Sequence, residues 1–244
     1  MKILIVTAVF SPEPVVSAKL SEDLAHELSK KNTVSVIAPN PTRPFGFKLN
    51  KKNIDRSYTL INLDSYTCPE SNVYGRFKES YSFGLACSKY IKENRDNIDL
   101  IYMNSWPIFA QYLTVKEANK FGIPIITHIQ DVYPESLSIK IPILGFLFNL
   151  IFIPIDKIIL KKSKKIIAIS EKMKNYLADS RQISLDKIKV VQNWQDAEAF
   201  INYEDTKNNN SVDKRLFTFM YMGNIGPVAG IDLLIDSFSK ANLG

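Results

Sequence analysis

The sequence has 244 residues, of which 45% are hydrophobic and 23% are charged, and its formal net charge at pH 7 is +6. A chain of this length and apolar content buries a full hydrophobic core, so an intrinsically disordered protein is excluded. It has room for one large domain or two small ones. Its cysteines, Cys68 and Cys87, are not closely paired, which excludes a compact zinc or redox motif and predicts that both are packing residues.

The first segment, MKILIVTAVF, is predicted to be a buried strand. Its apolar run is too short for the hydrophobic region of a signal peptide, and no small-residue cleavage site follows it. The next turn, within TAVFSPEPVVSAKL, has no glycine where a dinucleotide-binding turn needs one for close approach to the pyrophosphate. A nicotinamide or flavin cofactor is therefore not expected there.

Beyond this turn, short apolar runs alternate with longer segments whose apolar residues recur at helical spacing. The runs are typical of strands that are buried on both faces. They cover residues 2–10, 33–38, 59–63, 99–103, 124–129, 165–169 and 188–191. Helices are predicted around residues 20–28 and 77–85 and over 107–121, 143–162 and 171–180. The alternation predicts an α/β fold, a Rossmann-like doubly wound parallel sheet covered by helices on both faces.

Residues 40–57 are predicted to form a loop, because prolines interrupt the segment. The loop carries five basic residues against one acidic residue. The basic residues are Arg43, Lys48, Lys51, Lys52 and Arg56. Either the loop is solvated, or it belongs to a surface that meets an anionic membrane or ligand.

Residues 141–155 form an uncharged run that directly precedes a cluster of lysines. Residues 140–174 carry eight lysines against two acidic residues, which equals the net charge of the whole chain. Nucleic acid is not expected as a partner, because nucleic-acid binders spread basic residues over a face and interleave aromatic ones. As a helix, the uncharged run is roughly 22 Å long, short of the hydrocarbon core of about 30 Å, so it is not expected to span a membrane.

Two interpretations of this segment are open: a buried helix followed by solvated lysines, or a helix that lies on an anionic membrane. Apolar residues point in nearly every helical direction, which supports the membrane-bound helix. The lysines support it too, because each contributes about 1 kcal/mol of binding free energy near anionic headgroups. Pro142 and Pro154 favour a helix that starts near residue 142 and is broken or kinked near 154. The predicted membrane-contact residues are Phe146, Phe148, Phe152, Lys161, Lys162, Lys164 and Lys165.

The last part of the sequence has the pattern of a second domain. Residues 203–214 are predicted to be a polar linker. A strand over 217–224 and a helix over 231–238 follow it. We expect residues 1–202 to form the N-terminal domain and residues 215–244 to be the truncated start of a second Rossmann-like domain, because so few residues cannot bury a core of their own.

Five segments, in this order, resemble the GT-B glycosyltransferases of family 4, especially the bacterial enzymes that extend lipid-linked sugars for capsule and O-antigen. They are KILIVTAVFSPEP, LAHELSKKNTVSVIAPNP, THIQDVYPESL at 127–137, VVQNWQD at 190–196 and YMGNIGPVAGIDLLIDSF at 221–238. The resemblance implies the acceptor-binding N-terminal half of a GT-B fold and the start of its donor-binding domain. It also implies transfer with retention, assisted by the leaving phosphate, without a metal or a cofactor.

The resemblance implies roles for residues at matching positions. His128, at the end of a predicted strand, matches a histidine near the transferred sugar, and Asp131 follows it; these two are the predicted catalytic residues. The alternatives are a hydrogen-bonded structural histidine and a helix-capping carboxylate. The predicted acceptor-binding residues are Pro14, Ser17, Asn104, Trp106 and Glu135, and the predicted donor-binding residues are Gly223, Asn224 and Gly226.

The sequence departs from the family pattern in two places. Many relatives have glycines where this chain has Pro14, Val15 and Val16. Many also have an arginine at the position of Asn224 and a lysine at that of Ala229, so charge neutralisation must come from elsewhere.

The function implied is transfer of a sugar from a nucleotide sugar to a polyprenyl-diphosphate-linked glycan in cell-surface polysaccharide synthesis. The implied location is cytoplasmic, at the inner face of the cell membrane, with an anionic membrane surface as a partner. The two-glutamate donor signature of the family is expected beyond Gly244, so this chain alone is expected to be inactive. The alternatives are a non-catalytic membrane- or partner-binding module and a nucleotide-sugar epimerase of GT-B shape.

Overall fold

The computed structural model describes residues 1–43, 56–68, 72–104, 107–138, 145–195, 197, 201, 219–223 and 230–241. They fall into two compact units, Met1–Trp194 and Gln195–Gly244, and each unit is considered by itself. The first unit ends at Trp194, and the predicted end of the N-terminal domain at residue 202 stays a prediction.

In the described part of the first unit, seven parallel strands form one sheet, as the sequence predicts. The strands are β1 (Lys2–Val6), β2 (Thr33–Pro39), β3 (Thr59–Leu63), β4 (Leu100–Asn104), β5 (Ile125–Ile129), β6 (Lys165–Ala168) and β7 (Ile188–Val190). Their order is β3-β2-β1-β4-β5-β6-β7. The first predicted strand was too long, because the Thr7 hydroxyl donates to the Val9 carbonyl over 2.8 Å and the chain turns there.

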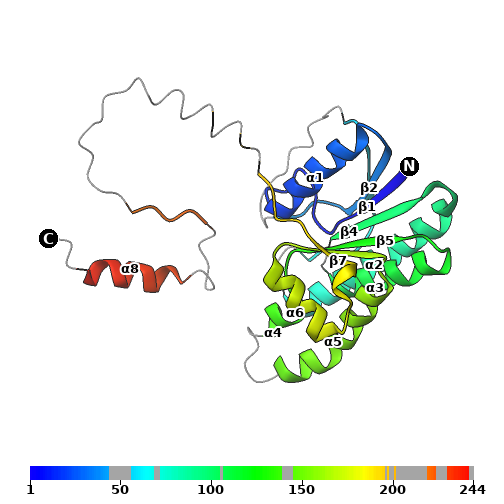
Figure 1. The fold of residues 1–244 in the computed structure, drawn as a ribbon. Helices are drawn as coiled ribbons and strands as arrows, with labels where there is room; N and C mark the ends of the chain where they lie inside the picture. The colour runs from blue at the N-terminus through cyan, green and yellow to red at the C-terminus, as the bar shows by residue number, and fades with distance from the viewer. Residues whose placement is uncertain are drawn as a thin grey trace. The chain divides into compact units, whose positions relative to one another are not determined.

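Helices cover both faces of this sheet (Figure 1). Helix α1 (Val16–Ser29) packs on one face, because the chain moves from β1 to β2 in one direction. From β3 to β7 the chain moves in the other direction, and four helices therefore pack on the opposite face. They are α2 (Val73–Asn94), α3 (Ile108–Lys120), α5 (Gly145–Lys162) and α6 (Glu171–Arg181). Three short helices, η1 (Arg95–Asn97), α4 (Glu135–Ser138) and η2 (Leu185–Lys187), lie in connections.

The two faces of the sheet carry separate hydrophobic cores, and this explains the continuous apolar runs in the sequence. Along β1, Leu4 and Val6 point into the larger core under α2, α3, α5 and α6, whereas Ile3 and Ile5 point into the smaller core under α1. Fully burying such a side chain stabilises the fold by about 1.5–3 kcal/mol. Cys68 and Cys87 are buried free thiols, as predicted, and burial raises the pKa of Cys87.

Helix α5 continues through Pro154 to Lys162 rather than ending at the proline. The described part of α5 starts at Gly145, and the predicted start near residue 142 lies outside the described residues. In the second unit, α8 (Ile231–Lys240) forms where a helix is predicted, after Gly230 with φ of 63°. The described residues of the predicted strand, 219–223, are not a strand, because among the described residues no neighbouring strand of this unit pairs with them.

Candidate functional site

The carboxyl edge of the sheet has a switch point between β1 and β4, where the chain leaves neighbouring strands toward opposite faces. Ligands of open α/β sheets bind in this place. The register brings the end of β4 next to the end of β5, with Asn104 opposite His128. The candidate site is built from the ends of β1, β4 and β5 and from the first turns of α1.

A chain of hydrogen bonds joins three of these elements. The buried Asn104 side chain donates from Nδ2 to Thr7 Oγ1 over 3.2 Å and to Ser21 Oγ over 2.8 Å. The Ser21 hydroxyl in turn donates to the Ser17 carbonyl over 2.7 Å. Asn104 and Ser17, both predicted to bind the acceptor, are thereby brought into one polar network that fixes the first turns of α1 against β4.

The N-terminus of α1 faces this edge without a side-chain cap. Its N-cap residue, Val15, is extended, and the first turn contains no acidic residue. The positive end of the helix dipole is therefore not offset locally and favours an anionic or hydroxyl ligand. Pro14 is exposed just before the helix, so its predicted contact with the acceptor stays a prediction.

His128 lies at the end of β5 and is 1% exposed. Its Nδ1 lies 2.5 Å from the Tyr102 hydroxyl, whereas among the described residues Nε2 has no hydrogen-bond partner. Burial lowers the pKa of His128 to about 4, so the ring is neutral at pH 7. A buried ring nitrogen without a partner is uncommon, and a functional role is one explanation for it.

The other residues predicted for this edge have different positions. Asp131 is exposed on the loop after β5, and Trp106 lies outside the described residues. The peptide bond between Tyr133 and Pro134, farther along this loop, is cis. Of the predicted donor-binding residues, Gly223 is described and exposed, whereas Asn224 and Gly226 lie outside the described residues.

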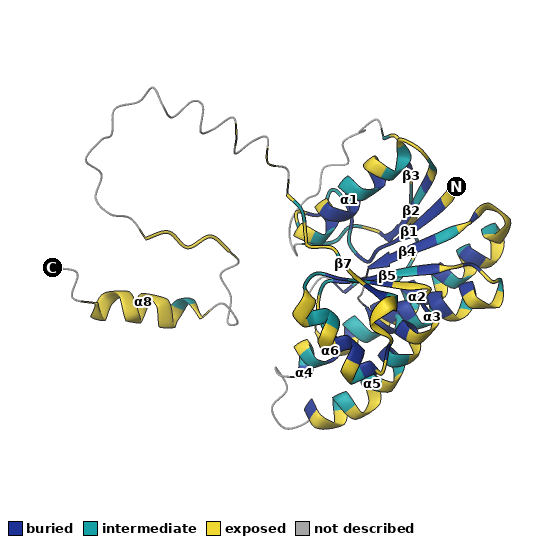
Figure 2. Ribbon diagram, in the orientation of Figure 1, coloured by how far each residue is buried: buried dark blue, intermediate teal, exposed yellow. Residues whose placement is uncertain are grey.

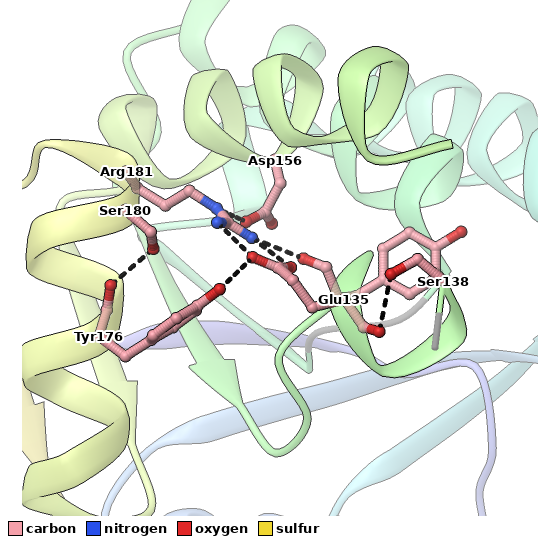
Figure 3. A network of polar contacts seen from close by, with 7 residues as sticks. Glu135, Ser138, Asp156, Tyr176, Ser180 and Arg181 are labelled. Carbon is pink, nitrogen blue, oxygen red and sulfur yellow. Dashed lines mark hydrogen bonds and ion pairs between the residues drawn. The ribbon is translucent and has the colours of Figure 1, made fainter. Parts of the chain in front are cut away.

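Glu135 is held by Arg181 in a buried ion network (Figure 3). Arg181 donates from Nη1 and Nη2 to the two carboxylate oxygens of Glu135, each over 2.7 Å. Its Nε donates to Asp156 over 2.7 Å, and Nη2 also donates to the Tyr133 carbonyl over 3.1 Å. The Tyr176 hydroxyl adds a bond of 2.8 Å to Glu135. Both oxygens of Glu135 are thus engaged, which favours a positioning role over the predicted contact with the acceptor.

This ion network ties the loop after β5 to α5 and α6. Burial acts to raise the pKa of Glu135, but the hydrogen bonds and charge of Arg181 outweigh it and hold the pKa below its usual value. The fully buried Arg181 ends α6, which begins where the Ser170 hydroxyl accepts the Met173 N–H over 3.1 Å. The network therefore fixes the path of the loop that follows His128.

A second ion cluster fixes the loop after β2. Glu13, in the turn after β1, accepts the backbone N–H groups of Thr42 and Arg43, both over 2.9 Å. The Arg43 side chain pairs with the buried Glu79 over 2.9 Å, and Arg76 pairs with the same carboxylate over 2.5 Å. Arg43 is thus part of a partly buried cluster, not of an open basic surface. Lys48, Lys51 and Lys52 lie outside the described residues.

The predicted membrane-contact residues of α5 divide between its two faces. Phe146 is 76% exposed, but Phe152 is 8% exposed and stacks on Phe77 with ring centroids 5.4 Å apart. Phe148 is half-buried against Phe152 and Tyr133. Phe152 is therefore corrected to a core residue. Phe148, four residues earlier, lies on the same inner side of the helix and packs against the core, but it is partly exposed.

The outer face of α5 carries a different set of apolar residues (Figure 2). They are Phe146, Leu147, Leu150, Ile151 and Ile158, all more than 40% exposed. Lys161, Lys162, Lys164 and Lys165 are exposed at the end of α5 and the start of β6. Among the described residues, no helix is long and apolar enough to cross a membrane.

Comparisons with known proteins agree with this architecture. The family model for Glycosyltransferase Family 4 matches residues 18–199. HepE from Anabaena, solved with UDP and glucose, is 13% identical and has a TM-score of 0.56, with 98% of this chain and 58% of that chain covered. Sucrose-phosphate synthase from Thermosynechococcus elongatus is 13% identical and has a TM-score of 0.52, with 79% and 48% covered. A comparison with curated proteins gives no match.

The family model covers most of the chain, so the chain belongs to glycosyltransferase family 4. The solved structures support the fold, the Rossmann-like α/β architecture of GT-B glycosyltransferases. The chain spans about half the length of the structures that it matches.

Several residues of the site and its ion network were not found from the sequence: Thr7, Ser21, Tyr102, Asp156, Tyr176 and Arg181. Tyr102 is 26 positions from His128, and Arg181 is 46 positions from Glu135. No local pattern links residues so far apart, so only the fold brings them together.

Proposed function

We propose that the protein transfers a sugar, with retention of configuration, from a nucleotide sugar to a polyprenyl-diphosphate-linked glycan. The first unit binds the acceptor, and the second unit contributes to the donor site. Family membership supports glycosyl transfer. HepE, which shares the fold, was solved with UDP and glucose, and this supports a nucleotide sugar as the donor.

The observation that carries the proposal is the polar edge at the switch point. It combines the uncapped N-terminus of α1, the network of Asn104, and the neutral His128 whose Nε2 has no partner among the described residues. A neutral imidazole can donate or accept one hydrogen bond, which suits a sugar hydroxyl. The leaving phosphate then assists deprotonation of the acceptor, so no nucleophile from the protein and no metal ion is required.

The exposed Asp131 is proposed to meet a hydroxyl of the acceptor glycan or of the transferred sugar, since it stands three residues beyond His128. Gly223, Asn224 and Gly226 are proposed to approach the diphosphate of the donor. Small residues permit such an approach by the backbone. The chain lacks the arginine and lysine of many relatives at Asn224 and Ala229, so other groups of the protein must balance the diphosphate charge.

The outer face of α5 and the four lysines beside it are proposed to hold the protein on the inner face of the cell membrane. Contiguous exposed apolar residues mark interaction surfaces. A helix of this kind lies in the interface, with its apolar side toward the acyl chains and its basic border at anionic headgroups. A lipid-linked acceptor requires an enzyme that works at this surface.

Exchange of Lys161, Lys162, Lys164 and Lys165 for glutamate is expected to weaken binding to vesicles with anionic lipid by more than about 100-fold, because each lysine contributes about 1 kcal/mol. Vesicle sedimentation measures this. The matched control replaces four exposed lysines elsewhere in the first unit, Lys2 on β1, Lys19 on α1, and Lys30 and Lys31 directly after α1, with glutamate, and should bind like the unchanged protein. If the control variant lost as much binding as the variant of Lys161, Lys162, Lys164 and Lys165, net charge rather than this surface would direct the protein to membranes.

Transfer itself is tested with the complete gene product, radiolabelled nucleotide sugars and a membrane extract that contains lipid-linked glycans. Label that moves into the lipid fraction supports the proposal. Conversion of the free nucleotide sugar without acceptor would instead identify an epimerase. Binding to vesicles without any reaction of a nucleotide sugar would identify a non-catalytic module.

A further inference from the structure

A small apolar pocket opens between the first turns of α2 and α3 and the loop after β5. Its volume is about 150 Å³. The described residues that line it are Val73, Arg76, Phe77, Ser80, Pro107, Ile108, Tyr133 and Leu137. Among the described residues, none that is predicted for the polar edge at the switch point lines this pocket.

The wall of the pocket is continuous with the aromatic cluster under α5. Phe77, which lines the pocket, stacks on Phe152, and Tyr133, on the opposite side, packs edge-on against Phe148 with ring centroids 6.0 Å apart. These two α5 residues form the inner face of the helix whose outer face is exposed and apolar. One layer of rings therefore separates the pocket from the proposed membrane surface.

Ser80 and Arg76, two polar residues of the pocket, are engaged within the protein. The Ser80 hydroxyl accepts the backbone N–H groups of Phe109 and Ala110 over 3.0 and 3.2 Å. Arg76 is paired with Glu79. The remaining lining is aliphatic or aromatic, so an apolar group gains more from entering the pocket than a polar one does.

We propose that this pocket binds the isoprene unit next to the diphosphate of the lipid-linked acceptor. This inference rests on the proposed function and names the part of the acceptor that the first unit recognises. A cavity of about 150 Å³ with aliphatic and aromatic walls binds benzene, and an isoprene unit, with five carbons, is of similar size.

The position of the pocket suits this occupant. Tyr133 belongs to the loop that leaves β5 at Ile129, directly after His128, so one end of the pocket lies near the carboxyl edge of the sheet. Val73, which also lines the pocket, is 55% exposed, and the neighbouring Tyr74 is 81% exposed. A chain that rises from the membrane past these two residues reaches the pocket with its diphosphate directed toward the polar edge.

The test is a titration of the 244-residue chain with geranyl diphosphate, followed by methyl NMR of its isoleucines, and a parallel titration with inorganic diphosphate. The Ile108 methyl signal should shift with geranyl diphosphate only. Val73→Trp, which fills the mouth from an exposed helical position, should weaken binding about 10–100-fold, since buried methylene groups contribute about 0.8 kcal/mol each. Tyr74→Trp, which adds a ring one residue away without lining the pocket, should bind like the unchanged protein.

Two results would overturn the inference: equal binding of geranyl diphosphate by Val73→Trp and Tyr74→Trp, or equal affinity for inorganic diphosphate. Leu137→Trp provides a second blocking variant from the opposite wall if Val73→Trp does not fold. The titration contains no nucleotide sugar, so failure of the pocket is distinguishable from failure of the transferase. If the 244-residue chain binds geranyl diphosphate and the complete gene product transfers no sugar, the pocket is retained and the proposed activity is lost.

Discussion

Replacement of Arg181 by leucine is expected to lower the free energy of unfolding by about 3–5 kcal/mol. The guanidinium group pairs with both Glu135 and Asp156, and the leucine leaves the buried Asp156 and the partly buried Glu135 without their cation. Desolvation of these charges is then no longer offset by the ion pairs. Urea-induced unfolding followed by circular dichroism measures the change.

The matched control is Arg95→Leu. Arg95 is exposed, and its ion pair with Asp96 spans 3.8 Å, so its loss should cost at most about 1 kcal/mol. Adding Glu135→Gln and Asp156→Asn to Arg181→Leu should restore part of the lost stability, because the neutral amides cost less to bury. If Arg181→Leu destabilised the protein no more than Arg95→Leu, the network would not hold the loop after β5.

Replacement of His128 by phenylalanine is expected to reduce sugar transfer by about 100-fold, as for loss of one positioned hydrogen-bonding group in an active site. Phenylalanine fills a similar volume but offers no nitrogen to a substrate hydroxyl. His128→Gln retains one hydrogen-bonding group and should keep more activity than His128→Phe. Activity is compared as kcat/KM for both variants in the transfer assay. Full activity of His128→Phe would exclude the imidazole ring from the reaction.

The same histidine should also set part of the acid sensitivity of the fold. Its pKa is about 4 in the folded protein, below the usual value of about 6.5 that applies to the unfolded chain. Between these two values the unfolded chain binds more protons, so stability decreases as the pH falls from 6.5 to 4, by about 3 kcal/mol in total. His128→Gln should lack this part of the decrease. This readout is independent of any substrate.

The inner strands β1, β4 and β5 were predictable because each is a short apolar run that is largely buried on both faces. The edge strands β3 and β7 are less buried and were predicted from their apolar, β-branched composition. The switch point followed from the order of strands and helices, and the histidine at the end of a strand could be placed at the carboxyl edge from sequence alone. The hydrogen-bond partner of this histidine could not be predicted from the sequence. Tyr102 looks like one more apolar residue of β4, and only the parallel register brings its hydroxyl to His128.

Helix α5 shows a different limit of the sequence. Its residues are apolar in almost every direction, so periodicity could not separate the side that packs from the side that is exposed. Contacts of Phe148 and Phe152 with rings from α2 and the loop after β5 decide the question. Glu135 shows the same limit. A carboxylate that contacts a substrate and a carboxylate that pairs with an arginine far away in the sequence can have the same local sequence.

The order of the strands also affects how the protein is made. β1 leaves the ribosome before the other strands of this sheet, yet it lies inside the sheet between β2 and β4. The roughly 95 residues that separate β1 from β4 take about 5–20 s to synthesise at usual rates of translation. During this time one edge of β1 has no neighbour, and an unpaired edge readily pairs with other chains. Nascent chains of this protein are therefore most prone to aggregate before β4 emerges.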